Sequence, residues 1–117
     1  VAKEIPVKGA KTLLLGITFK ENCPDIRNTK AIDVYRELKA YHMDVDLYDP
    51  WANAAEVKNE FGIELKDTIK NETYDTIILA VAHKEFLKLD ISKLRNKNSL
   101  IYDIKGVLSK ELIDTRL

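Results

Sequence analysis

The feature that most constrains this chain is a series of short, almost wholly apolar runs. The strongest are residues 11–19 and 75–82, and another occurs at residues 99–103; two shorter segments, 45–48 and 63–65, alternate apolar and acidic residues and also suggest strands. Apolar runs of this length, without regular alternation of polar residues, are typical of strands covered on both faces in a parallel sheet. We therefore interpret the five segments as five strands.

Helical patterns separate these runs. One helix is predicted from apolar residues that recur at three- and four-residue spacing, namely Ala31, Val34, Leu38 and Tyr41. Asn28 and Thr29 can cap its start. A second helix is expected from about residue 53 to residue 61, where Gly62 can stop it, and a third over roughly residues 84–94. Residues 67–70 are expected to form a brief helical turn.

Strands that alternate with helices along a chain need crossover connections, which produce a parallel sheet with helices on both faces. We predict an α/β fold: a three-layer, Rossmann-like, doubly wound parallel sheet of about five strands. Numbered along the chain, the expected strand order is 3-2-1-4-5. At 117 residues the chain has the usual length of a single domain, and residues 1–8 are expected to be the end of a connection from an upstream domain.

Composition excludes several classes of function. Nineteen basic and nineteen acidic side chains leave no net charge, so the electrostatic footprint of a nucleic-acid binder is missing. The longest apolar runs are far shorter than the roughly 20 residues of a membrane span, and no signal peptide opens the chain. The single cysteine predicts no disulfide and no metal site. We expect a cytoplasmic protein.

Ligands of open parallel sheets bind beyond the carboxyl ends of the strands, where the strand order reverses. The segment after the first strand, residues 19–28, is long and dense in polar groups. Lys20 and Arg27 supply a point charge and a planar fork of donors that suit phosphate oxygens. Alternatively, Arg27 pairs with Asp25 or Glu21 and holds the loop.

The same edge lacks the fingerprint of a dinucleotide site. Gly16 is the only glycine near the first turn, whereas a Gly-x-Gly-x-x-Gly pattern would be expected for NAD. Asp49, at the end of the second strand, either holds a ribose hydroxyl or forms an Asp-Pro turn. Cys23 has no base near it in sequence and is expected to be inert. His83 lies at the ligand edge, where a helix-start or packing role is favoured, and Trp51 is expected to be a half-buried anchor.

The first loop also carries a recognisable pattern, GITFKENCPDIRNT at residues 16–29. Later motifs follow in order: Tyr-Asp-Pro at 48–50, Ala-Val-Ala-His at 80–83 and Tyr-Asp-Ile-Lys-Gly-Val at 102–107. Together they resemble the C-terminal domain of the UDP-glucose/GDP-mannose dehydrogenase family over essentially the whole chain.

The resemblance implies a domain that binds the UDP part of a UDP-sugar and that is inactive alone. The complete enzyme would use NAD, bound mainly by an absent N-terminal domain, to oxidise the sugar C6 alcohol to a carboxylate in polysaccharide precursor synthesis. A homo-oligomer without a metal is implied. The loop favours the branch of the family that acts on UDP-N-acetylhexosamines.

The resemblance also implies roles for individual residues. Phe19 and Lys20 match positions that contact the nucleotide, and Lys105 falls where relatives have a basic residue reaching it. Arg27 is assigned to the same site, and Asp25 and Asn28 to shaping the loop. Lysine cannot reproduce the bidentate contact of an arginine, which weakens the assignment of Lys105.

Two other classes of protein stay open from the sequence. One is a free-standing interaction module such as a receiver domain, in which Asp67 would be the phosphoacceptor. The other is an NAD-binding domain in its own right, against which the missing glycines argue.

Overall fold

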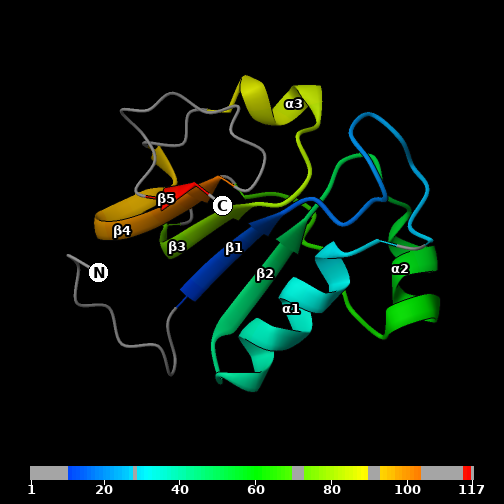
Figure 1. Cartoon of the computed structure of the whole chain (residues 1–117), viewed down its shortest axis with the longest axis horizontal. Coiled ribbons are helices and arrows are strands. Elements are labelled where there is room, and N and C mark those ends of the chain that lie inside the picture. The colour runs from blue at the N-terminus through cyan, green and yellow to red at the C-terminus, as the bar shows by residue number, and fades with distance from the viewer. Residues whose placement is uncertain (1–10, 28, 70–72, 90–92, 104–114, 117) are drawn as a thin grey trace.

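The computed structural model describes residues 11–27, 29–69, 73–89, 93–103 and 115–116. Its strands and helices alternate along the chain (Figure 1). In order, they are β1 (Lys11–Leu15), α1 (Ala31–Ala40), β2 (Asp44–Tyr48), α2 (Ala54–Phe61), β3 (Tyr74–Leu79), α3 (Lys84–Leu87), β4 (Arg95–Asp103) and β5 (Thr115–Arg116).

All strand pairs in the sheet are parallel, in the order β2-β1-β3-β4-β5. The chain moves outward from β1 to β2 and then crosses to β3 on the other side of β1, so the order reverses between β1 and β3. Leu15, the last residue of β1, lies in register with Tyr48 of β2 and Leu79 of β3. The predicted α/β class with a parallel sheet is confirmed, and its strands end together at one edge.

The prediction of a full strand at residues 63–65 is wrong. That segment makes an isolated bridge between Leu47 and Leu65, supported by a 2.8 Å hydrogen bond from the Lys66 N–H to the Leu47 carbonyl. The segment leaves the edge of β2 after one contact, so it extends no ladder. The expected order 3-2-1-4-5, which needs a strand at residues 63–65, is therefore not confirmed, and the fifth strand is instead β5, which the sequence did not indicate. Residues 67–69 are not helical.

The sheet separates two hydrophobic cores. On one face Leu13, Leu15 and Ile77 pack with Phe86 of α3. On the other face Leu14 and Ile78 pack with residues of α1 and α2, which places these helices on the opposite side from α3 (Figure 1). Alternate residues of β1 therefore face opposite cores, as the uninterrupted apolar run predicts.

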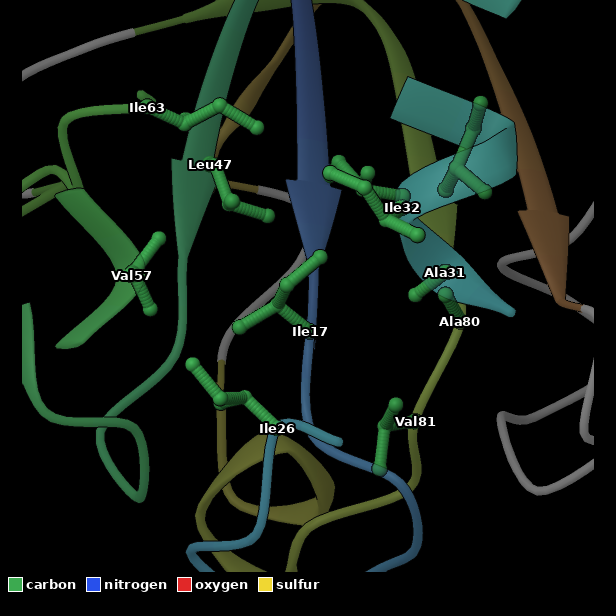
Figure 2. Packing of buried hydrophobic residues seen from close by; sticks show 11 residues of the cluster. Ile17, Ile26, Ala31, Ile32, Leu47, Val57, Ile63, Ala80 and Val81 are labelled. Atoms are coloured by element: carbon green, nitrogen blue, oxygen red, sulfur yellow. The ribbon is translucent and has the colours of Figure 1, made fainter. Parts of the chain in front are cut away.

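Apolar residues also pack beneath the carboxyl ends of the strands, the edge at which ligands of such sheets bind. Figure 2 shows Ile17, just after β1, among side chains from the first loop, β2 and α1. Its neighbours in this cluster include Ile26, Leu47, Val57 and Ile32. Because Ile26 is buried as well, both ends of the loop after β1 are anchored in the core.

The helix ends follow local chemistry. The N-cap of α1 is Lys30, which makes no side-chain cap hydrogen bond; the hydroxyl of Thr29, one residue earlier, accepts from the Ala31 N–H. Asn28 lies outside the described residues. Asn53 caps α2 by accepting from the Glu56 N–H, and Gly62 stops that helix in the left-handed conformation, as predicted. Tyr41 lies beyond α1 and is exposed, so its assignment to the apolar face is wrong.

Helix α3 is shorter than predicted. It ends at Leu87, whose side chain is exposed, whereas the sequence predicted a helix to about residue 94. No helix in the described part of the chain is long and apolar enough to cross a membrane.

Candidate functional site

Three loops meet where β1, β2 and β3 end, at the point where the strand order reverses. The Gly16 N–H donates to the Tyr48 carbonyl (3.0 Å), and the Ala80 and Val81 N–H groups donate to the Leu15 carbonyl (2.9 and 3.3 Å). Gly16 has a φ of +101°, and a Cβ built on it would lie 2.5 Å from the Val81 Cβ. Glycine is therefore required here because the β3 loop approaches the backbone of the first turn closely.

Asp49 is buried at the centre of these loops. Its Oδ2 accepts hydrogen bonds from the N–H groups of Ile17 (2.7 Å) and Thr18 (3.2 Å). Its Oδ1 accepts from the N–H groups of Trp51 (2.8 Å) and Ala52 (3.2 Å). The carboxylate thus joins the end of β1 to the turn after β2, which matches the alternative of a turn-forming aspartate.

Hydrogen bonding also sets the charge state of Asp49. Burial raises the pKa of this carboxyl, but the hydrogen bonds donated by His83 and by the Ile17 N–H lower it by more. The net pKa lies below its ordinary value of 3.8, so Asp49 is ionised in the folded chain at neutral pH. An ionised buried carboxylate is tolerated because N–H donors surround it.

The pH dependence of stability follows from this shift. A carboxyl whose folded pKa is lowered contributes stability that is fully present above its unfolded pKa of about 3.9 and is lost as pH falls through the folded pKa. We expect the free energy of unfolding from urea titrations to fall more steeply below about pH 4 in the wild type than in an Asp49→Asn variant. Parallel pH profiles for the two proteins would contradict the assignment.

His83 is the second buried polar residue at this edge, and its side chain has no exposed surface. Its Nδ1 accepts a 2.9 Å hydrogen bond from the Asn22 N–H. Nδ1 therefore carries the lone pair, and the proton of the neutral ring is on Nε2. Nε2 lies 2.9 Å from Oδ2 of Asp49 and 3.0 Å from the Thr18 hydroxyl. The expected packing role is present, together with hydrogen bonds that the sequence did not predict.

Trp51 covers the buried histidine. The two rings stack with centroids 5.9 Å apart, and the indole N–H donates to Glu85 at 2.8 Å. Trp51 is half-buried, as expected of an anchor for the turn after β2.

The loop after β1 is closed by a short backbone hydrogen bond, 2.7 Å from the Phe19 N–H to the Asp25 carbonyl. This bond leaves Phe19 and Lys20 exposed, with 55% of Phe19 accessible. Because they are exposed, these side chains are available to a ligand.

Cys23 is half-buried in the same loop. The described residues hold no cluster of groups suited to a metal ion.

Arg27 is paired within its own loop. Its Nε and Nη2 donate to the two oxygens of Asp25 at 3.0 and 3.1 Å. The hydrogen bond from Arg27 lowers the pKa of Asp25, and both side chains are accessible to solvent. The structure therefore contains the loop-holding pair that the sequence left open as an alternative, and a nucleotide contact of Arg27 stays a prediction.

A pocket of about 150 Å³ opens between the first loop, the end of β3 and the start of α1. Its lining residues are Thr18, Phe19, Thr29, Lys30, Ala31, Ala80 and Val81. The amino end of a helix attracts anions, and Lys30 adds a positive charge there. Lys30 was not predicted as a site residue, although its place at the start of a predicted helix beside the ends of the strands was a usable signal.

Of the predicted site residues, the structure places Phe19 at the pocket and Lys20 next to it in sequence. Lys105 and Asn28 lie outside the described residues. The hydrogen-bond roles of Asp49 and His83 were missed because they join positions 34 residues apart in the chain. Spacing along the sequence carries no signal for such a contact.

The parallel sheet, its switch point and the pocket at the start of α1 define a Rossmann-like α/β domain of the nucleotide-binding type. Residues 13–110 match the family described as the UDP-glucose/GDP-mannose dehydrogenase family, UDP binding domain. The chain belongs to this family, as the sequence motifs indicated, and family membership decides against a receiver domain.

Individual relatives agree with this assignment. The chain is 47% identical over 118 residues to the UDP-N-acetyl-D-glucosamine 6-dehydrogenase of Pseudomonas aeruginosa, covering 98% of the chain and 28% of that protein. It is 47% identical to the Salmonella typhi enzyme of the same name, covering 100% of the chain and 28% of that protein. The chain therefore spans little more than a quarter of the length of these relatives.

Solved structures show the same fold. The NDP-N-acetyl-D-galactosaminuronic acid dehydrogenase of Methanosarcina mazei Go1 superposes with a TM-score of 0.75 at 25% identity, over 91% of this chain and 22% of that one. The UDP-D-ManNAc dehydrogenase of Pyrococcus horikoshii gives a TM-score of 0.71 at 22% identity, over 91% of this chain and 24% of that one.

Proposed function

We propose that this chain is the UDP-binding, C-terminal domain of an NAD-dependent UDP-sugar 6-dehydrogenase. The observation that carries the proposal is the pocket at the switch point, which combines an exposed aromatic ring, a lysine and a helix start. Phe19 offers a face for stacking the uracil base, and Lys20 and Lys30 offer charge to the two phosphates. Arg27 and Lys105 are proposed as additional contacts, with Asp25 and Asn28 shaping the loop.

The first turn does not fit the pyrophosphate of NAD. A dinucleotide site needs free backbone N–H groups beside glycines, but the Ile17 and Thr18 N–H groups donate to Asp49, and Val81 fills the space beside Gly16. We therefore propose that NAD binds to another part of the complete enzyme, and we assign no redox step to the described residues.

The domain would contribute to the reaction through binding alone. Binding energy from the nucleotide can orient the sugar at a distant reacting carbon, so residues that never touch C6 can still raise the rate. The 47% identity to two UDP-N-acetyl-D-glucosamine 6-dehydrogenases supports a UDP-N-acetylhexosamine as the sugar nucleotide.

Isothermal titration calorimetry with UDP tests the proposal. A Lys20→Ala variant should bind UDP at least about tenfold more weakly, since a charge-assisted hydrogen bond is worth more than about 1.4 kcal/mol. Lys39→Ala, an exposed residue in the last turn of α1, is the matched control and should leave the affinity unchanged.

Two results would contradict the proposal. Unchanged UDP binding in a Lys20→Ala, Lys105→Ala double variant would remove the site assignment. Tighter binding of NAD than of UDP would instead support the alternative of an NAD-binding domain.

A further inference from the structure

The buried imidazole of His83 has more hydrogen-bond partners than a packing residue needs. The ring is fully buried beside Phe86 and Trp51, which would satisfy an apolar side chain of similar size. Both ring nitrogens nevertheless have partners on the loop after β1, because Nδ1 meets the Asn22 N–H and Nε2 meets the Thr18 hydroxyl. His83 therefore contacts that loop at two points.

Lys20 lies midway between these two points. The Thr18 hydroxyl, 3.0 Å from Nε2 of His83, donates its own proton to the Lys20 carbonyl at 3.0 Å. Two residues further on, the Asn22 backbone is held by Nδ1. The backbone of Lys20 is thus fixed on both sides through a single imidazole ring.

The protons of this network are mutually consistent. Asn22 gives its N–H to Nδ1, Nε2–H is shared between Asp49 and Thr18, and Thr18 gives its hydroxyl proton to the Lys20 carbonyl. Each donor meets an acceptor, so one tautomer of the neutral ring serves all the contacts. Asn22 has a φ of +54°, in the left-handed region that asparagine adopts more readily than most residues.

A second contact reinforces the tether. The Lys84 N–H donates to the Asn22 side-chain oxygen at 2.8 Å, so the loop is also joined to the start of α3. His83 lies between β3 and α3 and contacts Phe86 of α3, so the loop is tied to the packed start of that helix. Fixing a loop in its binding conformation reduces the entropy lost when a ligand binds.

We propose that His83 is a positioning residue that holds the Thr18–Asn22 segment so that Lys20 is presented to the nucleotide phosphates. The inference rests on the proposed function for its ligand, but the tether itself is independent of any ligand. His83 does not touch the nucleotide and acts through Lys20.

Amide hydrogen exchange on the ligand-free chain tests the tether. In a His83→Ala variant the Asn22 amide should exchange at least about tenfold faster, because its acceptor is lost. The Tyr74 amide, which donates to the Leu94 carbonyl at 2.8 Å, reports global opening, so the tenfold effect is the acceleration of the Asn22 amide beyond that of the Tyr74 amide. His83→Asn, whose side-chain oxygen can replace Nδ1 as an acceptor, should restore much of the protection, whereas His83→Gln should not.

Calorimetry with UDP then tests the link to Lys20 through a double-mutant cycle. His83→Ala should weaken UDP binding by about tenfold in the wild-type background and by much less in the Lys20→Ala background. A merely structural role would weaken binding equally in both.

The outcomes separate the two proposals. Unchanged exchange of the Asn22 amide, or an undiminished effect of His83→Ala in the Lys20→Ala background, overturns the positioning role. A wild-type chain that binds no UDP, but loses Asn22 protection in His83→Ala, refutes the proposed function and supports the tether.

Discussion

Replacing Gly16 with alanine is expected to destabilise the fold by about 3 kcal/mol or more, a large part of the total stability of a small domain. The new Cβ would lie 2.5 Å from the Val81 Cβ and 2.8 Å from the Val81 backbone nitrogen. No rotation of a side chain relieves the second contact. A φ of +101° adds conformational strain for any residue with a Cβ.

The matched control for this prediction is Gly62→Ala. Gly62 also has a positive φ, +71°, but apart from its own helix and chain neighbours no described residue has an atom within 4 Å of the position that its Cβ would take. That variant should cost only about 1 kcal/mol, from the left-handed conformation alone. Urea unfolding of both variants measures the difference, and equal costs would show that the close approach of Val81 is not what requires glycine at residue 16.

These two glycines illustrate which parts of the fold could be predicted from the sequence and which could not. Local signals located Gly62 correctly, because a glycine after an amphipathic run is a recognised helix stop. The apolar runs of β1 and β3 likewise identified strands covered on both faces. From the sequence, Gly16 was notable only because the other glycines of an NAD fingerprint are absent. Its structural role could not be predicted, because Val81, which approaches it, is distant in the chain.

The prediction of a strand at residues 63–65 was wrong for a similar reason. Three residues with apolar alternation suggest a strand, but whether a ladder forms depends on how long the segment runs beside β2, and it diverges after Leu65. Tertiary placement overrides a short local pattern in such a case.

In the candidate site, too, local features could be predicted from the sequence and contacts between distant residues could not. The loop after β1 and its basic residues could be predicted from the sequence, because they are contiguous in the chain, and their contacts with a nucleotide stay a prediction. The network beneath the loop involves Thr18, Asp49 and His83, which come from the ends of three different strands. The sequence placed Asp49 and His83 at the ends of strands but did not single out Thr18, and it could not pair their atoms, because pairing requires the register between strands.

Asp49→Asn is the second substitution for which we expect a large effect, a loss of about 2–4 kcal/mol. Asparagine has nearly the same shape as aspartate, so packing is preserved and only hydrogen bonding and charge change. In the wild type both carboxylate oxygens accept from N–H donors, Oδ2 from Ile17 and Thr18 and Oδ1 from Trp51 and Ala52. Whichever way the amide is oriented, its NH₂ group faces donors.

Urea unfolding at neutral pH measures this loss, with Asp67→Asn as the control. Asp67 is exposed, and its substitution should change the stability by less than about 0.5 kcal/mol. A small loss for Asp49→Asn would mean that the loops do not depend on the carboxylate.

The same variant decides between the two roles considered for Asp49. A carboxylate that held a ribose hydroxyl would be expendable for folding, so Asp49→Asn would weaken nucleotide binding and leave the stability nearly unchanged. A carboxylate that joins the loops must instead affect both, because Thr18 and His83 lose their acceptor and the segment that carries Lys20 loses its support. We expect the second pattern, since the hydrogen bonds from Ile17, Thr18, Trp51, Ala52 and His83 already occupy both oxygens of Asp49.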